Sequence, residues 1–195
     1  MEKGIKTDIK LAGVGGQGIL SIATVIGEAA TAAGLHLKQA EVHGMSQRGG
    51  DVQSDLRLST DVIHSDQIPL GAADLILSME PMEALRYLPY LSPEGAVVTS
   101  SRPFINIPNY PDETALLQEL DALPNVTRMD IEQVAKNLMA PRSANMVLLG
   151  MAARHLDILS PENLRQAIRT VFARKGEKIV EDNLKAFDAG YEGIQ

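Results

Sequence analysis

The stretch Gly13-Val14-Gly15-Gly16-Gln17-Gly18 decides the fold that we expect for this chain. It follows the apolar run TDIKLAGV at residues 7–14 and precedes residues 19–33, where apolar side chains recur every three or four positions. The first run is typical of a strand, and the second is typical of a helix that ends at Gly34. G-x-G-x-x-G between a strand and a helix is the spacing that brings a helix N-terminus close to a phosphate group. The stretch therefore predicts the start of a βα unit.

Strands and helices alternate along the remainder of the chain. Further strands are predicted at residues 35–42, 52–58, 73–78, 96–101 and 126–129, and further helices at residues 81–91, 112–120, 130–137, 143–156, 160–173 and 176–189. Residues 52–58 alternate between two faces, with Gln53, Asp55 and Arg57 on one of them, which is typical of a half-exposed antiparallel strand. We therefore expect an α/β fold that is Rossmann-like, with three α/β/α layers and a mostly parallel sheet containing at least one antiparallel strand.

The composition is that of a globular protein and excludes several classes. The chain has 195 residues, 45% of them hydrophobic, which predicts a single domain over residues 1–195. It has 18 Lys and Arg against 25 Asp and Glu, so a net charge of −7 gives no cationic surface for nucleic acid. Because Cys is absent, the chain offers no thiolate for an iron–sulfur cluster or a structural zinc ion. Neither a signal peptide nor a membrane span is recognisable, so we expect a cytoplasmic protein.

The glycine stretch has three open interpretations. It could be a tight turn that lets the strand and the helix pack closely, or an active-site or subunit-interface loop. It could also bind a dinucleotide, with Glu41 at the end of the second predicted strand accepting hydrogen bonds from a ribose. A Walker A loop is excluded, because Ile19 stands where Lys would follow. The residues that would form this cofactor-binding or interface loop are Gly13, Gly15, Gly16, Gln17 and Gly18.

A second candidate site is the segment His43-Gly44-Met45-Ser46-Gln47-Arg48-Gly49-Gly50. His43 could exchange a proton near neutral pH, and the guanidinium of Arg48 could bind a carboxylate or a phosphate. Alternatively, the segment is a surface turn whose arginine forms an ordinary salt bridge. The candidate catalytic residues are His43, Ser46 and Arg48, with Gly44, Gln47, Gly49 and Gly50 as parts of the loop. No spacing of His and carboxylate residues predicts a metal site.

The predicted helix at residues 143–156 is apolar nearly all round, which indicates burial in its own fold or against a partner. Asn145 lies near the start of this helix. We expect its side chain to cap the helix or to bridge to a neighbouring loop.

Three segments of the chain carry a resemblance to a known family. They are GVGGQGI from Gly13, EVHGMSQRGG from Glu41 followed by VQSDLRL, and NMVLLG from Asn145. Their combination resembles the gamma subunit or domain of the 2-oxoacid:ferredoxin oxidoreductases, which include pyruvate, ketoisovalerate and indolepyruvate enzymes. Within that family the chain is most similar to the small beta subunit of indolepyruvate ferredoxin oxidoreductase, and the resemblance spans nearly the whole chain.

The resemblance implies a subunit that is not active alone. Similar proteins decarboxylate a 2-oxoacid oxidatively with thiamine diphosphate, form an acyl-CoA and CO2, and pass two electrons through iron–sulfur clusters to ferredoxin. This chain has no Cys and lacks the GDG followed by NN that holds the metal and diphosphate in thiamine-diphosphate domains. The resemblance therefore implies a large partner subunit that carries thiamine diphosphate, Mg and the clusters, with CoA as co-substrate. An aryl pyruvate such as indolepyruvate is the expected substrate, although no pocket residue identifies it.

The resemblance also implies roles for the two loops. The glycine turn would have the shape of a dinucleotide fingerprint without binding NAD, and the segment from His43 to Gly50 would face the partner's active site or the CoA passage. Arg48 would contact an anion, supported by His43 and Ser46. The alternative is a stand-alone NAD(P)-binding Rossmann oxidoreductase or a nucleotide-sensing module, which would bind NAD without a partner. The isolated chain could form a homodimer through the apolar surface that a missing partner leaves exposed.

Overall fold

A computed structural model of the chain describes residues 4–43 and 50–193. Within those residues, six strands form one mixed sheet in the order β2-β3-β1-β4-β5-β6. The strands are β1 (Lys6–Val14), β2 (His36–His43), β3 (Asp51–Ser59), β4 (Ala73–Ser78), β5 (Leu91–Ser100) and β6 (Val126–Met129). β1, β4, β5 and β6 run parallel, whereas β3 is antiparallel to both of its neighbours, β1 and β2. The expected mostly parallel sheet with an antiparallel strand is confirmed.

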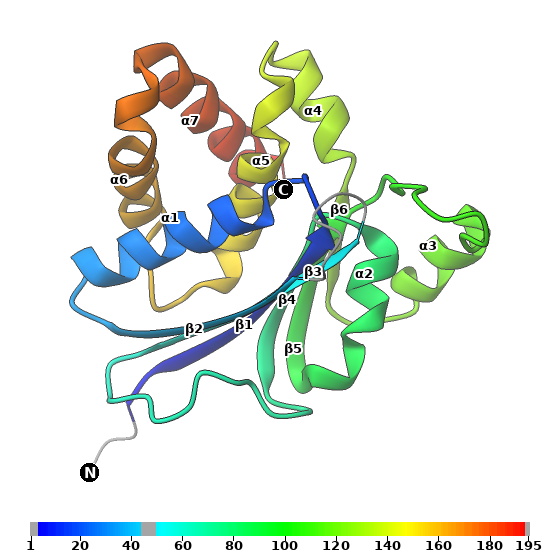
Figure 1. Cartoon of the computed structure of the whole chain (residues 1–195), viewed down its shortest axis with the longest axis horizontal. Helices are drawn as coiled ribbons and strands as arrows, with labels where there is room; N and C mark the ends of the chain where they lie inside the picture. The colour runs from blue at the N-terminus through cyan, green and yellow to red at the C-terminus, as the bar shows by residue number, and fades with distance from the viewer. Residues whose placement is uncertain (1–3, 44–49, 194–195) are drawn as a thin grey trace.

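Helices cover both faces of this sheet and complete three layers (Figure 1). The larger core lies under α1, α4, α5, α6 and α7, and the smaller core lies under α2 and α3. The helices are α1 (Ile19–Ala32), α2 (Pro81–Arg86), α3 (Glu113–Asp121), α4 (Ile131–Asn137), α5 (Ala144–Ala152), α6 (Pro161–Phe172) and α7 (Glu177–Glu192). None of the helices in the described part of the chain is long and apolar enough to cross a bilayer.

Two helices, α2 and α5, end several residues earlier than the sequence pattern predicted. α2 ends at Arg86 and is followed by a 3-10 turn at Leu88–Tyr90, because Pro89 has no N–H to continue an α-helix. α5 gives way to a 3-10 turn at Ala153–His155. Every residue of α5 is buried, so the helix that was predicted to be apolar all round is covered by its own fold.

Helices α5 and α7 pack unusually closely, and this contact places α5 in the fold. A Cβ on Gly190 of α7 would lie 2.0 Å from the carbonyl oxygen of Val147 on α5. Glycine is therefore required where the two backbones meet, since no Cβ approaches an oxygen so closely. The contact fixes the orientation of α5. The first turn of this helix, which includes Asn145, lies at the carboxyl end of the parallel strands.

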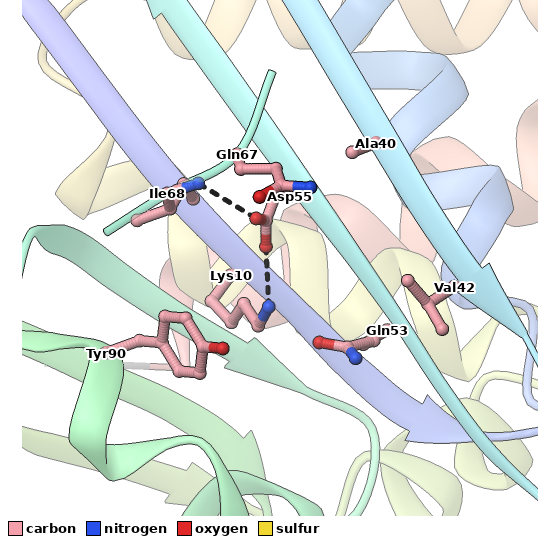
Figure 2. Close-up of a pocket in the computed structure, with 8 residues that line it drawn as sticks. All are labelled: Lys10, Ala40, Val42, Gln53, Asp55, Gln67, Ile68 and Tyr90. Carbon is pink, nitrogen blue, oxygen red and sulfur yellow. Dashed lines mark hydrogen bonds and ion pairs between the residues drawn. The ribbon is translucent and has the colours of Figure 1, made fainter. Parts of the chain in front are cut away.

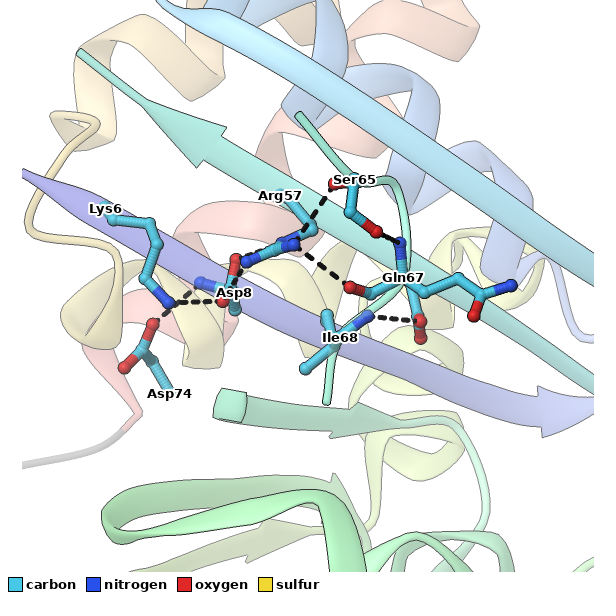
Figure 3. A network of polar contacts seen from close by, with 8 residues as sticks. Lys6, Asp8, Arg57, Ser65, Gln67, Ile68 and Asp74 are labelled. Carbon is cyan, nitrogen blue, oxygen red and sulfur yellow. Dashed lines mark hydrogen bonds and ion pairs between the residues drawn. The ribbon is translucent and has the colours of Figure 1, made fainter. Parts of the chain in front are cut away.

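The prediction that β3 is half-exposed is wrong, because residues 52–58 are all buried except Gln53 and Arg57, which are partly buried. The Arg57 side chain points toward the chain's own loop at residues 60–72 (Figure 3), and Asp55 accepts a hydrogen bond from the Ile68 N–H of that loop at 2.9 Å. Arg57 forms two hydrogen bonds with the Asp8 carboxylate, at 2.8 and 3.0 Å. Arg57 Nη1 also donates to the carbonyl oxygens of Ser65 and Gln67, at 3.1 and 3.0 Å. Side chains of the strands thus form hydrogen bonds with backbone groups of the loop at residues 60–72. This loop, and not a helix, covers that part of the sheet.

Candidate functional site

The glycine turn joins β1 to α1 and is held together by its own side chains. Gly18 caps α1 at φ +86°, in the left-handed region that favours glycine, and a Cβ there would lie 2.9 Å from Asn145 Nδ2. Gln17 folds back over the turn, so that its Oε1 accepts a hydrogen bond from the Val14 N–H at 2.7 Å. Gln17 Nε2 donates to the carbonyl of Met79, just after β4, at 3.4 Å. Gln17 is therefore a structural tie within this turn.

Asn145 bridges α5 to the glycine turn, so the alternative in which its side chain reaches a neighbouring loop is confirmed. Its side chain Nδ2 donates to the carbonyl oxygen of Gly18 at 3.1 Å. Asn145 is only 8% exposed, and among the described residues its Oδ1 has no hydrogen-bond partner. A buried acceptor without a partner costs about 1–3 kcal/mol. Such an atom marks a position where a donor from a bound molecule would be stabilising.

A cleft of about 740 Å³ opens beside Asn145 at the carboxyl end of the parallel strands. Its walls come from the glycine turn, from the segment between α4 and α5, and from the start of α7. Ligands of open α/β sheets bind at this end of the strands. The structure therefore brings Gly16, Gln17, Gly18 and Asn145 together at one cleft.

The charges that line the cleft are of two kinds. Arg142 and Lys175 are exposed on its wall and supply positive charge. Glu132 is partly buried, and burial raises the pKa of its carboxyl above the ordinary range, although the Ser100 hydroxyl donates to it at 3.1 Å. The Asp182 carboxylate also lines the cleft and is paired with Lys178 at 3.2 Å. An anionic group in the cleft would therefore meet two cations, a carboxyl whose charged form is disfavoured, and a carboxylate already paired with a lysine.

Met139 is a lining residue that sequence reasoning missed. It has φ +56° and is 87% exposed, an unfavourable conformation and environment for a large apolar side chain. The Met139 N–H donates to the Lys136 carbonyl, and the Ala140 N–H donates to the Ala135 carbonyl, each at 2.9 Å. This pattern ends a helix in a Schellman motif, where glycine is usual. The sequence carries no glycine to indicate such a turn, so nothing in the pattern marked Met139.

The second predicted loop is described only at its ends. His43 is the last residue of β2 and lies opposite Val52 of β3 in the strand register. The carbonyl of Gly50 accepts a hydrogen bond from the Gly15 N–H at 2.9 Å. The expected site residues Gly44, Ser46, Gln47, Arg48 and Gly49 lie outside the described residues. Gly50, the last residue of the segment, therefore lies next to the glycine turn.

The dinucleotide interpretation, which placed Glu41 beside a ribose, is contradicted by the strand order. That geometry requires β2 next to β1, whereas β3 separates the two strands here. Neighbouring strands lie about 4.8 Å apart, so the inserted strand moves Glu41 roughly 10 Å from β1. The Glu41 carboxylate instead accepts a hydrogen bond from Gln39 Nε2 at 2.6 Å on the edge strand.

A smaller pocket of about 190 Å³ lies around Lys10, on the face of the sheet that carries α2 (Figure 2). The Lys10 ammonium lies 2.6 Å from Asp55 Oδ1 and 4.2 Å from the centre of the Tyr90 ring. The other carboxylate oxygen of Asp55 accepts from the Ile68 N–H at 2.9 Å. The charge of Lys10 is thus neutralised within the chain, and the cleft beside Asn145 is the better candidate site.

Residues suited to a metal ion or cluster are not found in the described part of the chain. Its His, Asp and Glu side chains form no group of three or more that could hold a metal ion. The whole sequence also contains no Cys. An iron–sulfur cluster therefore does not fit this chain.

Comparisons with known proteins agree on one family. Residues 8–193 match the family described as pyruvate ferredoxin/flavodoxin oxidoreductase. The indolepyruvate oxidoreductase subunit IorB of Thermococcus kodakarensis is 38% identical over 197 aligned positions, covering 96% of this chain and 96% of the relative. The gamma subunit of a keto/oxoacid ferredoxin oxidoreductase from Geobacter sulfurreducens has a TM-score of 0.73 and 25% identity, over 96% of this chain and 95% of that one.

A larger solved protein contains the same fold as one part. The 2-oxoglutarate:ferredoxin oxidoreductase of Magnetococcus marinus, solved with 2-oxoglutarate, coenzyme A and succinyl-CoA, has a TM-score of 0.76 and 25% identity. The match covers 100% of this chain and 32% of that chain. The observed fold is therefore found both as a separate subunit and within a longer chain.

Proposed function

Because the chain belongs to the pyruvate ferredoxin/flavodoxin oxidoreductase family, we propose that it is the small subunit of a 2-oxoacid:ferredoxin oxidoreductase. The observation that carries this proposal is the 38% identity to an indolepyruvate oxidoreductase subunit along 96% of both chains. The proposed substrate is accordingly indolepyruvate or another aryl pyruvate. The assembled enzyme would convert the 2-oxoacid and CoA to an acyl-CoA and CO2, and the two electrons released would reduce ferredoxin.

The cofactors of this reaction are assigned to a larger partner subunit. The absence of Cys excludes cluster ligation by this chain, and its described residues include no group of carboxylates and histidines placed for a metal ion. Thiamine diphosphate, Mg²⁺ and the iron–sulfur clusters would therefore all be bound by the partner, and ferredoxin would be reached through the complex. The oxidation of the 2-oxoacid would not proceed on this chain alone.

The contribution of this chain is the binding of a polar, anionic group near the partner's active site. In this proposal Arg48 contacts a substrate carboxylate or a phosphate, and His43 and Ser46 supply supporting hydrogen bonds. The position of Gly50 beside the glycine turn supports a location of that loop near the cleft. Asn145 Oδ1, which has no partner among the described residues, would accept a hydrogen bond from the substrate or from CoA.

The partner subunit would cover the apolar side chains around the cleft. Phe104 is 45% exposed, Ile105 is 63% exposed and Met139 is 87% exposed, and Phe104 and Met139 both line the cleft. Exposed apolar side chains gathered at one site are typical of a protein interface. We further propose that residues 1–195 act as one gamma-type domain in this complex and that the complex is cytoplasmic.

Affinity purification of the tagged chain from its native cells tests the proposal. The expected eluate contains a larger subunit, iron and thiamine, and it reduces ferredoxin when supplied with indolepyruvate and CoA. Recovery of the chain alone, without iron or thiamine, would contradict the proposal. Titration of the isolated chain with NAD separates the alternative, because a stand-alone dinucleotide-binding domain would bind it without any partner.

A further inference from the structure

Glu80 is a fully buried carboxylate at the carboxyl end of β4, next to the cleft residue Met79. Its two carboxylate oxygens have different tasks. Oε2 accepts a hydrogen bond from the Glu83 N–H at 2.8 Å and thereby caps α2. Oε1 accepts hydrogen bonds from the Phe104 N–H, at 3.3 Å, and from the Tyr110 hydroxyl. Glu80 therefore ties a helix of the fold to the segment between β5 and α3.

That segment, residues 101–112, contains neither helix nor strand. Irregular segments of about 12 residues are uncommon in compact domains and are usually functional. Glu80 holds this one at Phe104 and at Tyr110, so that residues 104–110 form a strap closed on a single carboxylate. Burial, and then the hydrogen bond to Glu80, raise the pKa of the Tyr110 hydroxyl, which remains a protonated donor at physiological pH.

Phe104 connects the strap to the cleft. Its backbone N–H binds Glu80, while its side chain lines the cleft and remains 45% exposed. The position of this aromatic wall is thus set by a residue that does not itself line the cleft. Because Glu80 also caps α2, its carboxylate stays with that helix. Movement of residues 104–110 would therefore break their hydrogen bonds to Glu80.

We propose that Glu80 is a positioning residue for the cleft, which holds residues 104–110 so that Phe104 forms one wall of the ligand site. The proposal rests on the proposed function only for the identity of the ligand, which we take to be CoA. Leaving a buried acceptor with one hydrogen bond fewer corresponds to roughly a 10- to 100-fold change in an equilibrium. The open form of the strap should increase by this factor when the Tyr110 hydroxyl is removed.

Hydrogen–deuterium exchange of the assembled enzyme tests the structural part. Tyr110→Phe removes one bond to Glu80, and Glu80→Gln keeps an acceptor for the α2 cap while offering an amide group to the strap. Both variants should speed exchange at residues 101–112 roughly tenfold or more, with residues 81–86 unchanged. Tyr90→Phe makes the same chemical change in the Lys10 pocket and should leave residues 101–112 as in the wild type. Unchanged exchange in both strap variants, or equal loss of protection in α2, would overturn the proposal.

Steady-state kinetics test the consequence for the ligand site. Tyr110→Phe should raise the KM for CoA several-fold at saturating indolepyruvate, with kcat within about twofold of the wild type. Phe104→Ala should also raise this KM, and adding Tyr110→Phe to it should cause little further change, because both substitutions act through the same wall. Fully additive effects, or a fall in kcat alone, would contradict the positioning role. A wild-type complex without 2-oxoacid oxidation would refute the proposed function, while the exchange experiment would still decide the role of Glu80.

Discussion

Replacement of Asn145 by alanine should separate the stability of the chain from its function. Two effects on folding oppose each other. The lost hydrogen bond from Nδ2 to Gly18 costs about 0.5–1.5 kcal/mol, and its cost lies at the lower end because the Gly18 carbonyl also accepts from the Ser21 N–H at 3.1 Å. Removal of the buried Oδ1, which has no partner among the described residues, relieves about 1–3 kcal/mol. The expected free energy of unfolding of Asn145→Ala therefore lies between about 0.5 kcal/mol below and about 2.5 kcal/mol above that of the wild type.

The same substitution should weaken ligand binding in the assembled enzyme. A ligand donor that binds Oδ1 would lose a hydrogen bond worth about 0.5–1.5 kcal/mol, which corresponds to a rise in KM of roughly 2- to 13-fold. Urea unfolding of the isolated chain gives the stability, and initial rates with varied CoA or indolepyruvate give the two KM values. Asn183→Ala is the matched control for stability only, because Asn183 also lines the cleft. Asn183 is likewise buried, and its Nδ2 donates to the Ile179 carbonyl at 2.7 Å. Its loss should destabilise the chain by about 1 kcal/mol.

The reasoning fails if Asn145→Ala destabilises the chain by more than about 2 kcal/mol while both KM values stay unchanged. In that case Asn145 would be a structural tie between α5 and the glycine turn, and its Oδ1 would have no ligand. A small stability change together with unchanged KM values would refute the ligand-binding role alone.

Three further predictions follow from the packing, the pKa shifts and the candidate loop. Gly190→Ala should destabilise the chain by about 1–3 kcal/mol in urea unfolding, since its Cβ would lie 2.0 Å from the Val147 carbonyl oxygen. Gly27→Ala, whose Cβ would meet only a leucine methyl group at 3.3 Å, should be neutral or stabilising by up to about 1 kcal/mol. The pKa of Glu132 is raised on folding, so its carboxyl costs stability as the pH rises above the ordinary glutamate range; Glu132→Gln should flatten that loss in unfolding measured between roughly pH 4 and pH 8. Arg48→Ala should lower turnover of the assembled enzyme without affecting co-purification of the larger subunit, and unchanged kinetics would remove Arg48 from the proposed site.

The individual strands and helices could be predicted from the sequence because each depends on local periodicity. β4 and β6 have the predicted bounds, and α1 differs by a single terminal residue. The order of the strands could not be predicted in the same way, because it depends on contacts between distant segments. One usable signal was the charge pattern of β1 and β3. Asp8 lies opposite Arg57 and Lys10 lies opposite Asp55 in the antiparallel register, and such opposite charges favour direct pairing of the two strands.

The candidate site was predictable only in part, for the same physical reason. Glycines and an asparagine stand out in a sequence, and the structure brings Gly18 and Asn145 into contact. The strap and its attachment to Glu80 join residues that are 24 and 30 positions apart and belong to no recognisable motif. Met139 adopts a turn conformation in which glycine is usual. Its place in the wall of the cleft could therefore be recognised only from the backbone geometry.

The glycine turn shows why a dinucleotide fingerprint need not imply a bound dinucleotide. A Cβ on Gly13 would lie 3.1 Å from Gln17 Oε1 and 3.2 Å from the Met79 Cβ, and one on Gly18 would meet Asn145. The first and last glycines of the pattern are therefore closely packed against the chain's own side chains, and Gly18 also has the positive φ that favours glycine. Because β3 lies between β1 and β2, Glu41 is far from the position at which a carboxylate would bind a ribose. The turn instead allows Asn145 to approach its backbone closely. The Oδ1 of Asn145, a residue that lines the cleft, has no hydrogen-bond partner among the described residues. The same glycine spacing thus occurs here in a different surrounding, with β3 beside β1 and Asn145 packed on the turn.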